Sequence, residues 1–181
     1  AIPNDHFVTP PKFKIREDHN RDLKSKLAKA VIEMIKPFDT LMVDGGTTTL
    51  QIAVELSKRG DFEGVTLISN SIPVTLELIK NPKIKTILLG GYLAANELST
   101  IGPLSLKNID RFKATKTILG ASGIDLKYGF TEGDEYICEL KKRMLDLGEE
   151  KIVVTDSSKF GKIASFSLTP LNGINTIITD S

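Results

Sequence analysis

The sequence predicts one α/β domain built on a mainly parallel β-sheet with helices on both faces. Two observations carry this prediction. Short apolar runs alternate with segments of helical periodicity from residue 40 onward, and small or hydroxylated residues follow each of the first five runs. Strands separated by helices need crossover connections, which make the strands parallel. A chain of 181 residues suffices for one sizeable core and is short for two domains.

The N-terminal segment reads differently from the rest of the chain. Residues 1–19 contain three prolines, two histidines and many charges, with little periodicity, so we expect a linker or arm there and the domain proper over residues 20–181. An apolar stripe at every fourth residue then predicts an amphipathic helix, formed by Leu23, Leu27, Val31 and Ile35.

The alternation from residue 40 gives the remaining elements in order. Apolar runs predict strands over residues 40–44, 65–69, 84–89, 115–121, 152–156 and 175–179. Helical spacing after the first strand involves Ile52, Ala53 and Leu56. Ser71 is a candidate N-cap for a helix with Pro73 in its first turn and with Ile72, Leu76 and Ile79 on one side. A strong helix is indicated by Ile137, Leu140, Met144 and Leu147.

Small, hydroxylated or glycine residues follow five of the predicted strands. These segments are 44–49, 69–71, 90–91, 120–123 and 156–161. Ligands of open parallel sheets bind outside the carboxyl ends of the strands, and helix N-termini favour anions there. Each segment alone is more often a plain turn or cap. Five of them on one edge, with Lys159 as a placed cation, predict a phosphate or carboxylate site.

Composition excludes several other classes of protein. The 24 Lys and Arg residues nearly balance the 23 Asp and Glu residues, which argues against a stand-alone nucleic-acid binder. The single cysteine, Cys138, allows no internal disulfide and fits a reducing cytoplasm, and no apolar run is long enough for a membrane helix. No zinc-ligand spacing, P-loop or dinucleotide fingerprint occurs, so we expect no metal and no cofactor.

Taken in order, the motifs resemble the C-terminal effector domain of the DeoR family of bacterial transcriptional regulators. The resemblance covers nearly the whole chain and begins at Phe13 and Arg16. It continues through Asp44-Gly45-Gly46-Thr47-Thr48-Thr49, Ser69-Asn70-Ser71, Gly90-Gly91, Gly102-Pro103, Gly129 to Lys141 and Asp156-Ser157-Ser158-Lys159-Phe160-Gly161. Two departures are mild, because Gly45 and Ser69 keep a small or hydroxylated residue where the family has Ala or Ser and Thr.

The resemblance implies a fold similar to ribose-5-phosphate isomerase, glucosamine-phosphate deaminase and CoA transferases. It also implies a missing N-terminal helix-turn-helix head that binds operator DNA, to which residues 1–19 would lead. The implied ligand is a phosphorylated sugar or sugar metabolite whose binding changes DNA affinity, and the implied assembly is a homo-oligomer. The whole would be a cytoplasmic repressor of carbohydrate metabolism.

The resemblance also assigns roles at the level of single residues. Phosphate oxygens would be held by Gly46, Thr47, Thr48, Thr49, Ser69, Asn70 and Ser71, with Lys159 adding a charge. Sugar hydroxyls would be accepted by Asp44, Asp125 and Glu139. Further ligand contacts are expected at Gly90, Gly91, Gly123 and Lys141. The alternatives are a capping role for Asp44, a solvent turn for Asp125, and surface helix contacts for Glu139 and Lys141.

An isomerase or deaminase-like enzyme is the main alternative function, and a purely structural interaction domain is the third. Isomerisation needs a base beside a carbonyl and groups that stabilise an enediolate. Candidate residues are Asp125, Glu132, Asp134, Glu139 and Lys159. The D-G-A-D-E and K-G-G-G-G patterns of the isomerase are incomplete here, so the sequence favours a sensor over an enzyme.

Overall fold

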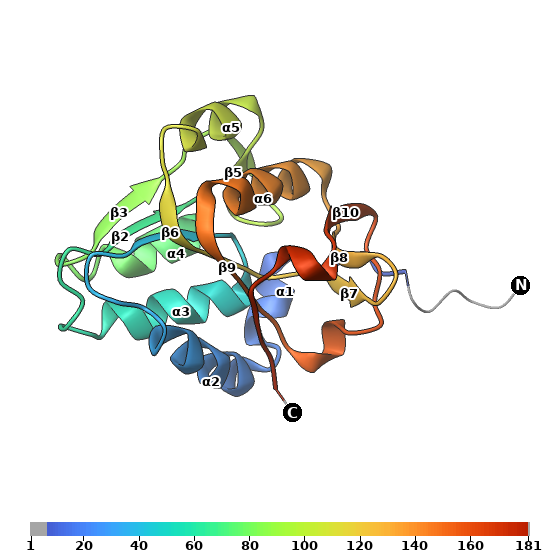
Figure 1. The fold of residues 1–181 in the computed structure, drawn as a ribbon, viewed down its shortest axis with the longest axis horizontal. Helices are drawn as coiled ribbons and strands as arrows, with labels where there is room; N and C mark the ends of the chain where they lie inside the picture. The colour runs from blue at the N-terminus through green and yellow to red at the C-terminus, as the bar shows by residue number, and fades with distance from the viewer. Residues whose placement is uncertain (1–6, 181) are drawn as a thin grey trace, which may run out of the picture.

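A computed structural model describes residues 7–180 and has a six-stranded sheet at its centre (Figure 1). Every neighbouring pair in this sheet is parallel. The order across the sheet is β3 (Lys85–Leu88), β2 (Thr66–Ser69), β1 (Thr40–Val43), β6 (Ala114–Leu119), β9 (Gly148–Val154) and β11 (Thr176–Ile178). The chain therefore moves outward from β1 to one edge, returns to β6 and moves outward to the other edge. The switch point of this doubly wound topology lies between β1 and β6.

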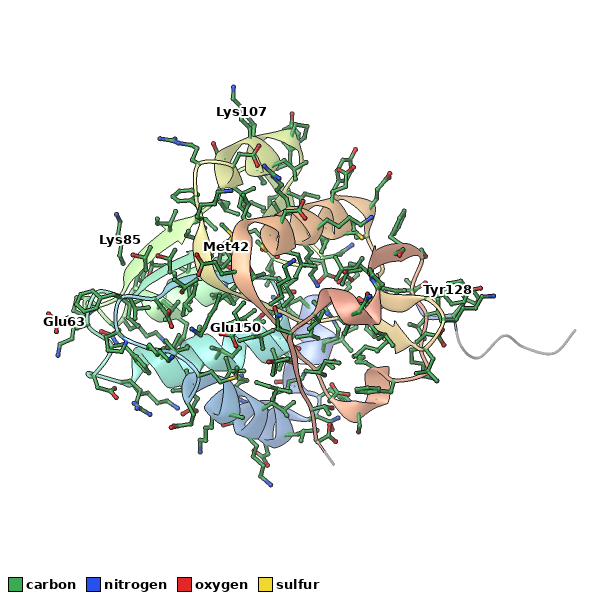
Figure 2. The ribbon with its side chains drawn as sticks, viewed as in Figure 1. Met42, Glu63, Lys85, Lys107, Tyr128 and Glu150 are labelled. Atoms are coloured by element: carbon green, nitrogen blue, oxygen red, sulfur yellow. The ribbon has the colours of Figure 1, made fainter. Side chains whose placement is uncertain are left out.

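Helices cover both faces of the sheet, as the sequence predicts. One face carries α2 (Arg21–Ile32), α3 (Thr47–Ser57) and α4 (Ile72–Leu78), and the other carries α5 (Pro103–Ile109) and α6 (Glu135–Leu147) (Figure 1). Alternation along β1 serves both layers, because Leu41 and Val43 join the first core and Met42 joins the second. Figure 2 shows Met42 in the interior, whereas Lys107 on α5 projects outward.

Two small antiparallel units, which the sequence does not predict, are attached to this framework. A hairpin of β4 (Tyr92–Ala94) and β5 (Ser99–Ile101) follows β3. A three-stranded sheet of β7 (Gly123–Asp125), β8 (Gly129–Glu132) and β10 (Phe166–Thr169) begins directly after β6. Single 3-10 turns occur at Ser157–Lys159 and Leu171–Gly173. The hairpin and the small sheet supply two carboxylates, Glu97 and Glu132, to the site described below.

Most sequence expectations for the elements are confirmed. All six strands are found, and Leu27, Val31 and Ile35 of the first helical stripe are buried. The Ser71 hydroxyl accepts a hydrogen bond from the N–H of Val74 and caps α4 as expected. Among the described residues, 7–180, no helix combines the length and the hydropathy that a membrane crossing requires.

Two expectations need qualification. The side of α4 with Leu76 and Ile79 faces outward, because Val74 and Leu78 pack into the core instead. Within the segment expected to be an arm, Phe13–Asp18 forms helix α1, and Phe13 is buried in the first core. Residues 1–6 lie outside the described residues, and the boundary at residue 19 stays a prediction.

Candidate ligand-binding site

A polar cavity of about 80 Å³ lies at the carboxyl end of the central sheet, at the switch point between β1 and β6. The loop after β1 contributes Asp44 to Gly46, the first turn of α3 contributes Thr47 and Thr48, and the loop after β6 contributes Gly120 to Ser122. Helix α6 contributes Lys141 and the 3-10 turn after β9 contributes Lys159. This is the position at which open α/β sheets bind ligands, because the diverging crossovers leave a crevice there.

Lys141 is buried at the base of this cavity between two carboxylates. Its Nζ atom lies 2.7 Å from Oδ2 of Asp44, pairs with Glu132, and donates to the carbonyl of Gly120 at 3.1 Å. Burial alone would lower the pKa of Lys141, but the charges and hydrogen bonds of Asp44 and Glu132 raise it well above its usual value. The lysine therefore stays charged and ties α6 to the loops after β1 and β6.

Glu132, at the end of β8, is 6% exposed and satisfied by three donors. These donors are the ammonium of Lys141, the hydroxyl of Ser122 and the N–H of Gly133. Burial by itself would raise the pKa of Glu132, but the charge of Lys141 and the three hydrogen bonds lower it. Glu132 is therefore held as an ionised, fully engaged carboxylate.

Asp44 is 1% exposed, and its two oxygens differ. Oδ2 accepts from the N–H of Gly120 at 3.0 Å and pairs with Lys141. Oδ1 is buried and has no hydrogen-bond partner among the described residues. A buried acceptor without a donor costs about 1–3 kcal/mol.

The loop after β1 is held in shape by Thr49. The Thr49 hydroxyl accepts from the N–H of Gly46 at 2.8 Å and lies 3.0 Å from the carbonyl of Asp44. These bonds keep the first turn of α3 against the cavity, so that the helix N-terminus adds a partial positive charge to that wall. Thr49 itself is fully buried and is not part of the cavity lining.

Three cationic side chains from other elements line the same cavity. They are Arg16 on α1, Lys24 on α2 and Lys159. Burial lowers the pKa of Lys24, which is only 4% exposed. Asp156 opposes this shift, while the nearby charges of Arg16 and Lys159 lower the pKa further. Cations that destabilise one another in this way create a site that an anion would stabilise.

Comparison with known proteins now identifies the family. The sequence pattern described as the DeoR C terminal sensor domain matches residues 19–181. The chain belongs to this family. An HTH-type transcriptional regulator of Haemophilus influenzae is 32% identical over 157 residues, which are 87% of this sensor domain chain and 60% of that protein. The glycerol-3-phosphate regulon repressor of Escherichia coli K12 is 28% identical over 181 residues, all of this chain and 70% of that protein.

A solved structure shares the fold at much lower sequence identity. Ribose 5-phosphate isomerase A of Methanocaldococcus jannaschii aligns with a TM-score of 0.56 over 78% of the sensor domain chain and 55% of that protein, at 18% identity. This confirms the similarity to ribose-5-phosphate isomerase that the resemblance implied. Because fold alone does not determine function, it assigns no activity.

The structure brings six of the predicted ligand residues of the sensor domain into the cavity lining. These are Asp44, Gly46, Thr47, Thr48, Lys141 and Lys159. The other nine lie outside that lining: Thr49, Ser69, Asn70, Ser71, Gly90, Gly91, Gly123, Asp125 and Glu139. Whether any of the fifteen contacts a ligand stays a prediction.

The Ser69-Asn70-Ser71 segment secures the β4–β5 hairpin and α4. Ser69 accepts from the N–H of Ser71 at 3.0 Å, and Ser71 caps α4. The side-chain amide of Asn70 donates to the carbonyl of Thr100 in β5 at 3.2 Å, and the backbone carbonyl of Asn70 accepts from the N–H of Thr100. Their side chains therefore orient the hairpin that carries Glu97.

The remaining predicted residues outside the lining have local roles. Gly91 has a φ of +133°, and a side chain there would meet the carbonyl of Ile101 at 2.6 Å, while Gly90 also has positive φ. A side chain at Gly123 would meet the Lys162 carbonyl. Asp125 caps the β7–β8 turn by accepting from two backbone N–H groups. Glu139 is exposed on α6. Turn, close packing and surface exposure account for these positions.

Sequence reasoning missed several charged residues of the lining as ligand contacts. Arg16 entered only through the family resemblance, and Glu132 only as a candidate catalytic group. Lys24 and Glu97 carry no local signal, because one is a charged residue in an amphipathic helix and the other lies in a short hairpin turn. Only the tertiary packing brings them to the carboxyl end of the sheet.

Proposed function

We propose that this chain is the effector-binding domain of a DNA-binding transcriptional repressor of carbohydrate metabolism, and that the effector is a phosphorylated sugar or sugar metabolite. One observation carries the proposal. Lys24 and Lys159 line the same cavity as the start of α3, and so does Asp44, whose buried Oδ1 has no hydrogen-bond partner among the described residues. An anion suits the two lysines and the start of α3, a hydroxyl suits Asp44, and a sugar phosphate carries both.

The relatives support the regulatory part of the proposal. Their names describe transcriptional regulators, and one is a repressor of a glycerol-3-phosphate regulon. The chain spans 60% and 70% of these two proteins. We propose that residues 1–19 lead to a helix-turn-helix head that binds operator DNA, and that the protein acts in the cytoplasm.

Binding without turnover is the second part of the proposal. Proton abstraction beside a carbonyl needs a base whose pKa lies near the working pH, and covalent catalysis by lysine needs a neutral amine. The lowered pKa of Glu132 and the raised pKa of Lys141 oppose both roles. The likeness to an isomerase therefore supports a shared way of holding sugar phosphates rather than shared chemistry.

A thermal-shift screen tests the function directly. The panel contains glycerol 3-phosphate, pentose and hexose phosphates, the matching free sugars and inorganic phosphate. A ligand at about 100 times its dissociation constant stabilises a protein by roughly 2.7 kcal/mol. We expect one phosphorylated compound to exceed its free sugar and to be recovered unchanged. Conversion of the compound would support the enzyme, and binding of none would refute the sensor.

We also propose that the domain assembles with copies of itself. Leu76 and Ile79 on α4 are 57% and 65% exposed, and Leu88 on the neighbouring edge strand β3 is 45% exposed. Exposed apolar side chains beside an open sheet edge are typical of protein interfaces. Light scattering should give a multiple of the 19.8 kDa chain mass, and Ile79→Lys should reduce it. A monomer at all concentrations would refute the proposal.

A further inference from the structure

The cavity at the switch point is too small for the ligand proposed above. Its volume is about 80 Å³, whereas small-molecule sites commonly occupy roughly 300–1,000 Å³. A second hollow of about 440 Å³ lies beside it, lined in part by Pro10, Ala94 and Ile101. The second hollow alone lies within that range, and the two hollows together lie within it as well.

The same side chains form part of both linings. Arg16, Glu97, Glu132 and Ile137 line the cavity at the switch point and also the second hollow. Two of them form an ion pair across the boundary, Arg16 from α1 and Glu97 from the turn between β4 and β5. Their side chains are 21% and 20% exposed. We call this pair the Arg16–Glu97 gate.

The gate leaves both of its partners incompletely satisfied. The Nε atom of Arg16 is buried and has no hydrogen-bond partner among the described residues. Burial raises the pKa of Glu97 above its ordinary value, even though the charge of Arg16 opposes the shift. A phosphate group offers more acceptor oxygens and more charge than one carboxylate, and it can bind guanidinium in a bidentate manner. Such a ligand can compete with Glu97 for Arg16.

We propose that the two hollows are one ligand site divided by the Arg16–Glu97 gate, and that a phosphorylated ligand opens it by drawing the Arg16 guanidinium away from Glu97. This inference rests on the proposed function, because it concerns the same anionic ligand. Once Arg16 binds the phosphate, the boundary between the hollows is removed. The sugar part of a pentose or hexose phosphate then extends toward Pro10, Ala94 and Ile101.

The backbone around Arg16 is tied to the turn between β4 and β5 and to α2. Phe13 is buried, and its N–H donates to the carbonyl of Asn96 beside Glu97 at 2.9 Å. The ammonium of Lys24 donates to the Arg16 carbonyl from α2. A ligand that draws Arg16 away from Glu97 therefore acts on α1 and, through the contact of Lys24 with the Arg16 carbonyl, on α2.

Inorganic phosphate serves as the probe, measured by calorimetry at fixed ionic strength. Glu97→Gln releases Arg16 from its partner and should tighten phosphate binding about 3–10-fold. Arg16→Gln should weaken binding at least about 10-fold, and Glu97→Gln should give no gain in the Arg16→Gln background. The matched control is Asp61→Asn, which removes a carboxylate from the exposed pair with Arg59 outside both hollows and should leave the affinity within about twofold.

Several outcomes would refute the proposal that the Arg16–Glu97 gate opens for a phosphorylated ligand. Unchanged or weaker phosphate binding by Glu97→Gln would do so, as would a gain that persists in the Arg16→Gln background, since that gain would reflect net charge alone. A crystal structure with bound phosphate and Arg16 still on Glu97 would refute it without any variant. If a sugar phosphate binds the wild type but Glu97→Gln changes nothing, the gate fails and the proposed function stands. If neither phosphate nor any sugar phosphate binds any folded variant, both fail.

Discussion

Replacement of Lys141 by Met is the sharpest test of how the site is held together. The substitution keeps a long unbranched side chain but removes the one ammonium that lies between Asp44 and Glu132. Both carboxylates remain buried, at 1% and 6% exposure. Oδ2 of Asp44 keeps the N–H of Gly120, and Glu132 keeps Ser122 and Gly133, so the charge itself is what loses its compensation.

The expected loss of stability is large. Removal of one partner from a buried ion pair costs about 3–5 kcal/mol, because the remaining charge stays buried without its counter-charge. For a domain of this length each kcal/mol lowers the melting temperature by roughly 2–4 °C, so the variant should melt roughly 6–20 °C below the wild type. The loss should depend on pH, because Glu132 without Lys141 keeps its burial and loses its main stabilising partner.

The sign of the pH dependence follows from that change. In the variant, burial raises the pKa of Glu132 above its unfolded value of about 4.3. A carboxyl with a raised folded pKa is tolerated below the unfolded pKa and becomes destabilising as the pH rises through the folded pKa. The gap between wild type and Lys141→Met should therefore be wider at pH 8 than at pH 5, and Glu132→Gln in the variant background should recover part of it at pH 8.

Urea unfolding followed by circular dichroism at several pH values measures these quantities. The control is Lys142→Met, which makes the same substitution at the next position of α6, where the side chain is exposed. Surface substitutions of this kind usually stay within about 0.5 kcal/mol of the wild type. A Lys141→Met loss no larger than that of the control, or a gap that narrows as the pH rises, would refute the assignment of Lys141 as the central counter-charge.

Three further outcomes are expected. Asp39→Asn should destabilise by about 1–3 kcal/mol at pH 7, because it removes the buried carboxylate 3.0 Å from Lys116 and leaves this lysine only the more exposed Glu150 at 3.5 Å. Burial would raise the pKa of Asp39, but its hydrogen bonds lower it, so the stability that Asp39 contributes is present above pH about 3.9 and lost as the pH falls further. Urea unfolding should therefore show a smaller difference in unfolding free energy between wild type and Asp39→Asn at pH 3 than at pH 7. An equal difference at both pH values would contradict this. Lys24→Met should weaken phosphate binding measured by calorimetry, because it removes a buried cation from the cavity lining, and an unchanged affinity would contradict a role for Lys24 in binding the anion. Ser71→Ala should cost about 1 kcal/mol in thermal unfolding, since the N–H of Val74 loses its acceptor, and no change would mean that the cap contributes nothing.

The sheet and one wall of the site could be predicted because their signals are local. A strand is read from four to seven apolar residues, and the carboxyl-end rule then brings Asp44, Thr47 and Lys159 to one edge without any knowledge of packing. The two small antiparallel units escaped because their strands have only three or four residues, too short for a clear period of two. Their carboxylates, Glu97 and Glu132, were therefore not expected as ligand contacts.

The Ser69-Asn70-Ser71 segment shows why the rest of the site could not be read from the chain. Hydroxyl and amide side chains after a strand have the same local pattern whether they face a ligand or a neighbouring hairpin. Here the hairpin β4–β5 packs against the carboxyl end of β2, and the Asn70 amide donates to the hairpin instead of to a ligand. The cavity therefore lies at the ends of β1 and β6. Which strand end stays open is decided by long-range packing.

The elements that carry the charges around the cavity indicate which parts of the domain ligand binding can displace. The sheet side supplies the Lys141 cluster, in which one buried ammonium is already shared by two carboxylates and ties α6 to the loops after β1 and β6. The incompletely compensated cations come instead from α1 and α2. Arg16 has a buried Nε without a hydrogen-bond partner among the described residues, and Lys24 has a lowered pKa. A ligand shifts a conformational equilibrium only by its difference in affinity between the states, so the groups that gain most from an anion are those that can transmit its binding. In the proposed repressor these are the helices closest along the chain to the proposed DNA-binding head. We therefore expect ligand binding to change the placement of α1 and α2 while the central sheet and α6 stay fixed.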